Sequence, residues 1–290
     1  MRPVRLFIFG MGYTARAFGR AMADVAWMGG TTRDADRAGR LAERHFRARV
    51  FDGENFDAAM LDDLRAATHV LVSIPPRGGD PVLAHFSEAI GAAPDLKWIG
   101  YLSTVGVYGN YAGAWVSEAT TPHPQQDRSI ERLATEKAWA KLALARGVPL
   151  ATFRIAGIYG PGRNTFVNLA EGKAHRIVKP GQVFNRIHVD DLAAALVAAL
   201  DANAAGIFNL ADNEPAPPQD VVAFAAKLMG VAPPPEVPFA EADLSPMART
   251  FYADNKRVTN HRMKTELAVT LRHPTYRQGL TTLWQEATWR

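Results

Sequence analysis

Short apolar runs alternate with segments of helical periodicity through the first two-thirds of the chain. Val4–Phe9 is an apolar run rich in strand-forming residues, and it ends at a glycine. In residues 15–25, Ala15, Phe18 and Met22 recur at helical spacing. The alternation continues with expected strands at 26–32, 48–51, 70–74, 97–103 and 150–155, and expected helices at 34–46, 57–66, 81–92 and about 130–145. Such alternation predicts an α/β fold with a doubly wound parallel sheet.

The pattern loosens from about Gly157, where glycines and prolines punctuate the chain. Helices are still expected at 191–200, 219–229 and 279–286, with a strand at 207–210. We therefore expect one domain over residues 1–156. Residues 157–290 are expected to form mostly a smaller C-terminal substrate lobe, with some segments returning to the first domain's sheet. A ligand cleft is expected between the two.

The first expected strand leads directly into a glycine motif. Gly10-Met11-Gly12-Tyr13-Thr14-Ala15 fits the pattern Gly-x-Gly-x-x-Gly/Ala. In that pattern the first glycine allows a tight turn, the second lets the backbone approach a pyrophosphate, and the small third residue lets helix and strand pack closely. The phosphates would meet the unpaired N–H groups of a helix N-terminus. The motif predicts a Rossmann-like domain that binds a dinucleotide through Gly10, Gly12, Tyr13, Thr14 and Ala15.

The end of the second expected strand bears on the choice of cofactor. NAD-binding proteins commonly carry an Asp or Glu there, bonded to the ribose 2′-hydroxyl. This chain has Thr31-Thr32-Arg33, and a guanidinium favours the 2′-phosphate of NADP. We expect NADP, with NAD the less favoured cofactor; the alternative is that Arg33 begins a solvated helix capped by Asp34. At the end of a central strand, the residues expected to flank the cofactor crevice are Ser73, Ile74 and Pro75.

Composition and charge limit the classes of protein to which the chain can belong. It has 290 residues, no cysteine, and no apolar run approaching the roughly 20 residues of a membrane helix. The absence of cysteine agrees with a reducing compartment, so a cytoplasmic location and no membrane partner are expected. The formal net charge is +4, but the arginines are scattered rather than gathered in a stripe. No nucleic-acid partner is therefore expected, and no metal site, because no His/Asp/Glu cluster has ligand spacing.

Several segments, in the right order, resemble one known family. They are Leu102-Ser103-Thr104-Val105-Gly106-Val107-Tyr108-Gly109, then residues 153–162 (FRIAGIYGPG), Ile187-His188-Val189-Asp190-Asp191, and Phe208-Asn209-Leu210-Ala211. They resemble the atypical extended short-chain dehydrogenase/reductases, a group related to NAD-dependent epimerases and dehydratases. The resemblance implies a Rossmann fold, a C-terminal substrate lobe and hydride chemistry at a nicotinamide. It also implies that Thr104 takes the place of the catalytic Ser/Thr.

The family's catalytic Tyr-x-x-x-Lys is absent at the expected place. Counting back from Glu136 places Arg132 at the lysine position and Arg128 at the tyrosine position. An arginine stays protonated and has no acceptor, so it cannot replace the tyrosine. Arg132 could hold the nicotinamide ribose and Arg128 a carboxylate or phosphate; the alternative is that both lie on a solvated helix face. Tyr108 or water would then supply the proton.

A second departure concerns the substrate. Nucleotide-sugar enzymes of this group often carry an arginine four residues before the histidine of Ile-His-Val, and Phe184 stands at that position here. Arg163, Asn164 and Arg186 could supply other anion contacts. We therefore expect an NADP-dependent oxidoreductase or epimerase-like enzyme acting on a small anionic or sugar-like substrate, and expect a homodimer. The second hypothesis is a sensor or regulatory protein that binds the nucleotide without turnover.

Overall fold

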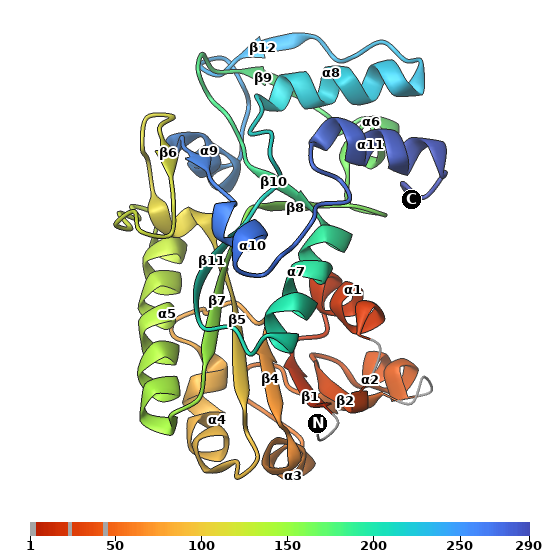
Figure 1. Cartoon of the computed structure of the whole chain (residues 1–290). Coiled ribbons are helices and arrows are strands. Elements are labelled where there is room, and N and C mark those ends of the chain that lie inside the picture. The colour runs from red at the N-terminus through yellow and green to blue at the C-terminus, as the bar shows by residue number, and fades with distance from the viewer. Residues whose placement is uncertain (1–3, 23–24, 43–45) are drawn as a thin grey trace.

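The computed structural model describes residues 4–22, 25–42 and 46–290. Its centre is a seven-stranded sheet in which every pair of neighbouring strands is parallel (Figure 1). From edge to edge the order is β11 (Gly206–Leu210), β7 (Leu150–Ile155), β5 (Trp98–Thr104), β4 (His69–Val72), β1 (Val4–Phe9), β2 (Val25–Thr32) and β3 (Arg47–Val50). The strand order reverses between β1 and β4, where a doubly wound sheet forms its ligand crevice. The predicted fold class is confirmed.

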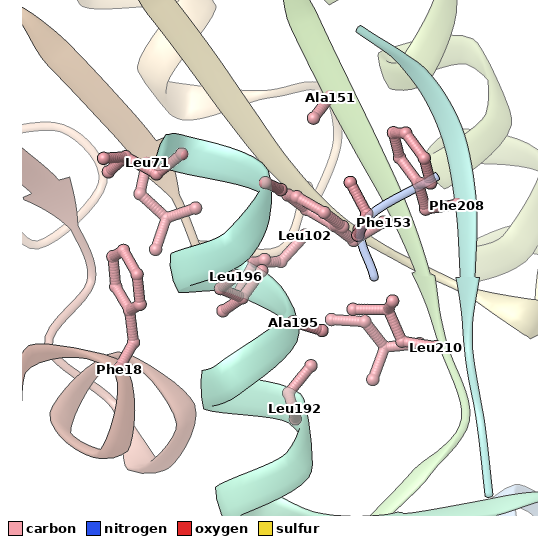
Figure 2. Close-up of a cluster of buried hydrophobic side chains, with 14 of the residues drawn as sticks. Phe18, Leu71, Leu102, Ala151, Phe153, Leu192, Ala195, Leu196, Phe208 and Leu210 are labelled. Atoms are coloured by element: carbon pink, nitrogen blue, oxygen red, sulfur yellow. The ribbon is translucent and has the colours of Figure 1, made fainter. Parts of the chain in front are cut away.

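Helices cover both faces of this sheet because neighbouring strand residues point to opposite sides. In β1, Leu6 and Ile8 pack toward α1 (Tyr13–Ala21) and α7 (Val189–Asp201), while Phe7 and Phe9 pack toward the other face. Figure 2 shows Leu192 and the neighbouring α7 side chains directed at β7 and β11. The elements on the second face are α3 (Ala59–Ala66), α4 (Pro81–Ala92) and α5 (Asp127–Arg146).

A smaller set of elements lies beyond the carboxyl ends of the strands (Figure 1). It contains three two-stranded parallel sheets and a separate hydrophobic cluster around Phe166 and Tyr276. Its strands are β6 (Trp115–Val116), β8 (Gly157–Tyr159), β9 (Arg176–Val178), β10 (Arg186–His188), β12 (Glu236–Pro238) and β13 (Arg257–Val258). Its helices are α6 (Thr165–Ala170), α8 (Pro218–Met229), α9 (Pro246–Ala253) and α11 (Tyr276–Gln285). Helix α10 (His261–Thr265) packs instead against β11 of the main sheet, where Met263 joins the core. The chain re-enters the main sheet at β11, so the sheet and these elements are interleaved in sequence.

Most differences from the predicted elements lie at element ends. The helix expected over 15–25 ends at Ala21, and Val25 already belongs to β2; residues 23–24 lie outside the described residues. The helix expected over 34–46 is α2 (Ala35–Ala42), with Phe46 in no helix and residues 43–45 outside the described residues. Strand β4 ends at Val72, two residues before the predicted end. No helix in the described part of the chain combines the length and apolar character of a membrane span.

Candidate active site

The glycine turn after β1 is fixed by the end of β2. The backbone N–H groups of Gly10 and Met11 donate to Oγ1 and the carbonyl oxygen of Thr31, at 2.8 and 2.7 Å. Gly10 has φ of +89°, and a Cβ there would lie 2.9 Å from Cγ1 of Ile74. A side chain at Gly10 is therefore disfavoured both by its backbone conformation and by the neighbouring strand end.

The N-terminus of α1 fits a pyrophosphate. Gly12 caps the helix without a side-chain hydrogen bond, and the first turn contains no acidic residue. A Cβ built on Gly12 would meet nothing within 4 Å, so the space above the helix end is open. Ala15 is fully buried, as close packing of helix and strand requires. The hydroxyl of Tyr13, the first residue of α1, donates to the carbonyl oxygen of Pro161 at 3.0 Å.

Two arginines follow the end of β2. Arg33 is exposed, while the carboxylate of Asp34 accepts from the backbone N–H of Arg37 at 2.7 Å, as a helix-capping residue does. Arg37, which the sequence analysis did not single out, donates from Nη2 to the carbonyl oxygen of Met11 at 2.5 Å. One arginine thus braces the glycine turn, and the other remains free to contact a ligand.

A cleft of about 1040 Å³ is lined both by residues at the strand ends and by residues of the smaller set of elements. It brings together residues predicted from widely separated motifs. Those that line it are Thr14, Ser73, Thr104, Arg128, Arg132, Arg163 and Arg186. Ile74 packs under Gly10 instead, and Pro75 is exposed without lining the cleft.

The two arginines predicted to stand at the family's Tyr and Lys positions, Arg128 and Arg132, both line this cleft. Arg132 donates from Nη1 to the carbonyl oxygen of Leu102 at 2.5 Å, which holds it beside the end of β5. Arg128 donates from Nη2 to Oγ1 of Thr250 at 3.0 Å, and its Cζ lies 4.2 Å from the ring centre of Phe251. Both contacts of Arg128 are to α9. Arg132 is half-buried, whereas Arg128 is exposed, so the solvated helix face stays an alternative for Arg128.

Tyr108 does not fit the role of proton donor that the sequence suggested. It is fully buried, its hydroxyl donates to Oδ1 of Asn209 at 2.7 Å, and it does not line the cleft. Burial also raises its pKa. The chain turns inward through the 3₁₀ segment η1 (Val105–Tyr108), which directs this side chain into the protein. The ring instead covers the guanidinium of Arg154, whose Cζ is 4.8 Å from the ring centre.

Asn164 also needs a correction, because all its polar atoms are used within the protein. Its Oδ1 accepts from the backbone N–H groups of Phe166 and Val167 and thereby caps α6. Its Nδ2 donates to the carbonyl oxygens of Gly160 and Trp289, at 2.8 and 2.6 Å. It is buried and does not line the cleft, so it is a structural residue rather than a substrate contact.

The cleft is strongly cationic. Six of its lining side chains are Arg or Lys, His175 lines it as well, and Asp254 is the one acidic lining residue in the part of the chain that the structure describes. Lys256, missed by the sequence analysis, donates from Nζ to the carbonyl oxygen of Gly109 at 2.6 Å and lies 3.4 Å from Asp254 Oδ2. Burial lowers its pKa. The basic lining residues are Arg128, Arg132, Arg163, Lys173, Arg186 and Lys256.

Comparisons with known proteins agree with this architecture. A family model described as "NAD dependent epimerase/dehydratase family" matches residues 85–211. A 3-diazoavenalumate denitrifying reductase from a Streptomyces species is 30% identical over 213 residues, covering 70% of this chain and 59% of that protein. The chain thus spans about three-fifths of the length of this curated relative.

Two solved structures extend the similarity over nearly the whole chain. A conserved protein of unknown function from Silicibacter pomeroyi is 45% identical, with a TM-score of 0.87 and coverage of 97% of this chain and 98% of that one. The UDP-glucuronic acid 4-epimerase of Bacillus cereus, solved in complex with NAD, is 17% identical, with a TM-score of 0.75 and coverage of 98% and 99%. The latter likeness is one of fold.

Proposed function

Because this chain belongs to the NAD dependent epimerase/dehydratase family, we propose that it is an NADP-dependent oxidoreductase acting on a small anionic substrate. The observation that carries the proposal is the cleft, which is lined by Thr14 of α1, by Thr104 and by six Arg or Lys side chains. A cationic cleft with one carboxylate attracts and holds an anion. An uncharged sugar would not need so many basic side chains around it.

The chain's own residues divide the tasks of cofactor binding. The N-terminus of α1 at Gly12 would take the pyrophosphate, with Thr14 at the cleft side of the same turn. Arg132, fixed by Leu102, would hold ribose hydroxyls. A bound nicotinamide would supply or accept a hydride. Arg33, exposed at the end of β2, would bind the 2′-phosphate that distinguishes NADP from NAD.

The reacting end of the cleft is organised around Thr104. Its side chain accepts from the backbone N–H of Gly106 at 3.1 Å, which leaves its own hydroxyl proton free to donate to a substrate oxygen. Negative charge that develops on that oxygen would be stabilised by the guanidinium groups of Arg128 and Arg132. Neither arginine can give up a proton, and Tyr108 is directed away, so the proton would come from water.

A second function is favoured by one observation. Arg128, which we predict at the family's tyrosine position, contacts Thr250 and Phe251 of α9 rather than a catalytic partner. A protein that binds the nucleotide as a sensor, without turnover, would tolerate this arrangement.

Turnover separates the two functions. We would follow NADPH oxidation at 340 nm with matched carbonyl compounds, each offered as a free acid and as its methyl ester, such as pyruvate with methyl pyruvate and 4-formylbenzoate with its ester. The oxidoreductase proposal predicts oxidation with at least one acid, faster than with its ester. NADPH binding without oxidation by any pair would support the sensor. Oxidation that favours the esters would contradict the anionic substrate.

A further inference from the structure

We propose that Arg186 forms a subsite of the cleft that grips a carboxylate of the substrate through the paired Nε and Nη2 edge of its guanidinium. The proposal rests on the proposed function for the presence of an anionic substrate, and it goes further by assigning the anion's chemistry and its residue.

The orientation of Arg186 is fixed by only one of its nitrogens. Nη1 donates to the carbonyl oxygens of Phe184 and Ala216, at 2.9 and 3.2 Å. Those two residues pair with each other through an antiparallel bridge, so the acceptors are held rigidly. The nitrogens Nε and Nη2 make no hydrogen bond within the described residues, and neither is sealed from solvent. Arg186 lines the cleft, and the proposal places the carboxylate of the ligand at this free edge.

The same edge holds a carboxylate at two other arginines of this protein. Arg154 uses Nε and Nη2 to bind both oxygens of Glu136, at 3.2 and 2.8 Å. Arg262 binds both oxygens of Glu266 in the same way, at 2.5 and 2.6 Å. Paired parallel N–H groups match the planar carboxylate, and such bidentate contacts are strong and directional. At Arg186, no carboxylate of the described residues binds the same edge.

The positive charge of Arg186 is not neutralised by an ion pair with a carboxylate of the described residues. No acidic side chain within the described ranges forms an ion pair with it at 4.0 Å or less. Burial lowers the pKa of Arg186, so its bare charge is poorly solvated and a ligand anion would stabilise it. Among the groups that act on it electrostatically, Asp212 contributes most and Tyr276 comes next.

Asp212 also favours a monoanion over a dianion. It follows β11, and its Oδ1 accepts from the backbone N–H of Glu214 at 3.0 Å, while Oδ2 is buried without a partner. A phosphate, with up to two charges, would be repelled more strongly by Asp212 and Glu214 than a carboxylate would. A carboxylate also uses all the donors that the free edge presents, whereas a third phosphate oxygen would have no donor from this residue.

The test uses three aromatic probes of similar shape: benzoate, neutral benzamide and phenyl phosphate. Each is titrated by calorimetry into the full-length protein with and without saturating NADPH. We would compare the wild type with Arg186→Gln, with Arg186→Lys, and with the matched control Arg163→Gln, which removes the same charge from the same cleft. Circular dichroism checks that each variant is folded.

We expect benzoate to bind the wild type more tightly than either other probe. Its affinity should fall at least tenfold in both Arg186 variants, because lysine keeps the charge but lacks the paired edge, and less than threefold in Arg163→Gln. Four results would each overturn the proposal. Arg186→Lys could keep its affinity for benzoate, or the Arg163 and Arg186 variants could lose equal affinity. Phenyl phosphate could bind more tightly than benzoate, or benzoate could fail to bind the wild type.

Asp212→Asn gives a second reading if the Arg186 variants fail to fold. Asparagine can keep the hydrogen bond to the N–H of Glu214 while removing the charge. At pH 8, where Asp212 is ionised, benzoate should therefore bind the variant at least threefold more tightly; unchanged or weaker binding at that pH would contradict the subsite. Failure of the nucleotide proposal looks different, because it would remove NADPH binding and leave benzoate binding intact.

Discussion

At the scale of single residues, the properties of the site depend on which charged side chains are buried and which of them have hydrogen-bond partners. Arg154 is 2% exposed and binds both carboxylate oxygens of Glu136 through Nε and Nη2, whereas the same two nitrogens of Arg186 have no hydrogen-bond partner among the described residues. Asp212 lies at the opposite extreme, with one carboxylate oxygen buried and unpaired. Burial of a carboxylate without a partner disfavours its charged form. The individual environments therefore predict different responses to pH and to ligands.

The first residue-scale prediction concerns the pH dependence of folding. Burial raises the pKa of Asp212 from 3.8 to about 7, although Arg186 partly opposes this rise. A carboxyl group whose pKa is raised on folding binds its proton more tightly in the folded state, so its contribution to stability decreases from about pH 4 to about pH 7 and is constant above. The free energy of unfolding of Asp212→Asn minus that of the wild type should rise by roughly 2–3 kcal/mol from pH 5 to pH 8. Urea unfolding at the two pH values measures this difference; an unchanged difference would contradict the raised pKa.

The second prediction at this scale concerns the preference for NADPH over NADH, which we assign to the arginines after β2. Arg33→Ala should weaken NADPH binding about tenfold or more and leave NADH binding within about twofold, since a charge-assisted hydrogen bond contributes roughly 1.5–3 kcal/mol. Arg37→Ala should weaken both nucleotides, because Arg37 braces the turn at Met11. Arg40→Ala, exposed on the same helix, is the control. Fluorescence titration gives the affinities, and equal weakening of both nucleotides by Arg33→Ala would remove the preference for NADP.

At the scale of elements, the length of a strand or helix determined whether it could be predicted from the sequence. The strands at 4–9 and 150–155 and the helix at 81–92 were predicted with the bounds the structure has, because each carries a full apolar pattern. The strand pairs β8–β10 and β9–β12 were missed, since three residues are too few to show a period.

The candidate site divides in a related way. The glycine turn was predictable because its function depends on a local motif. The helical spacing of Arg128 and Arg132 likewise places both on one face. Tyr108 and Asn164 were misassigned because nothing local reports that a loop turns its side chain inward. Lys256 and the free edge of Arg186 depend on partners far away in sequence, which only the fold brings together.

One contact between elements should dominate the position of α5. Glu136 of α5 joins Arg154 of β7 and accepts from the hydroxyl of Ser103 in β5, at 2.5 Å, so it clamps the helix to two strands. Arg154→Leu should destabilise the fold by about 3–5 kcal/mol, because it leaves a buried carboxylate unpaired. The double variant with Glu136→Leu should recover part of that loss. Urea unfolding of both variants checks this, and a single variant within about 1 kcal/mol of the wild type would show that the pair is not a clamp.

At the scale of the whole molecule, the cleft forms where two differently built parts meet. The parallel sheet contributes its strand ends and Thr14 of α1, while the smaller elements contribute Arg163, Lys173 and Arg186. The boundary after residue 156 stays a prediction, because β11 and α7 belong to the sheet although they follow it in sequence. The expected homodimer also stays a prediction. On α5, Leu144 is 83% exposed and Ile130 is 48% exposed.

The central claim is that the turn after β1 seats the cofactor's pyrophosphate on α1. Gly12 has φ of −80° and open space at its Cβ position, so Gly12→Val should fold normally while its side chain occupies the phosphate site. The most direct test is calorimetric titration of NADPH and NADH into the wild type and this variant. We predict binding of both nucleotides to the wild type, tighter for NADPH, and no detectable binding to folded Gly12→Val. Wild-type protein that binds neither nucleotide, or a variant with unchanged affinity, would contradict the account.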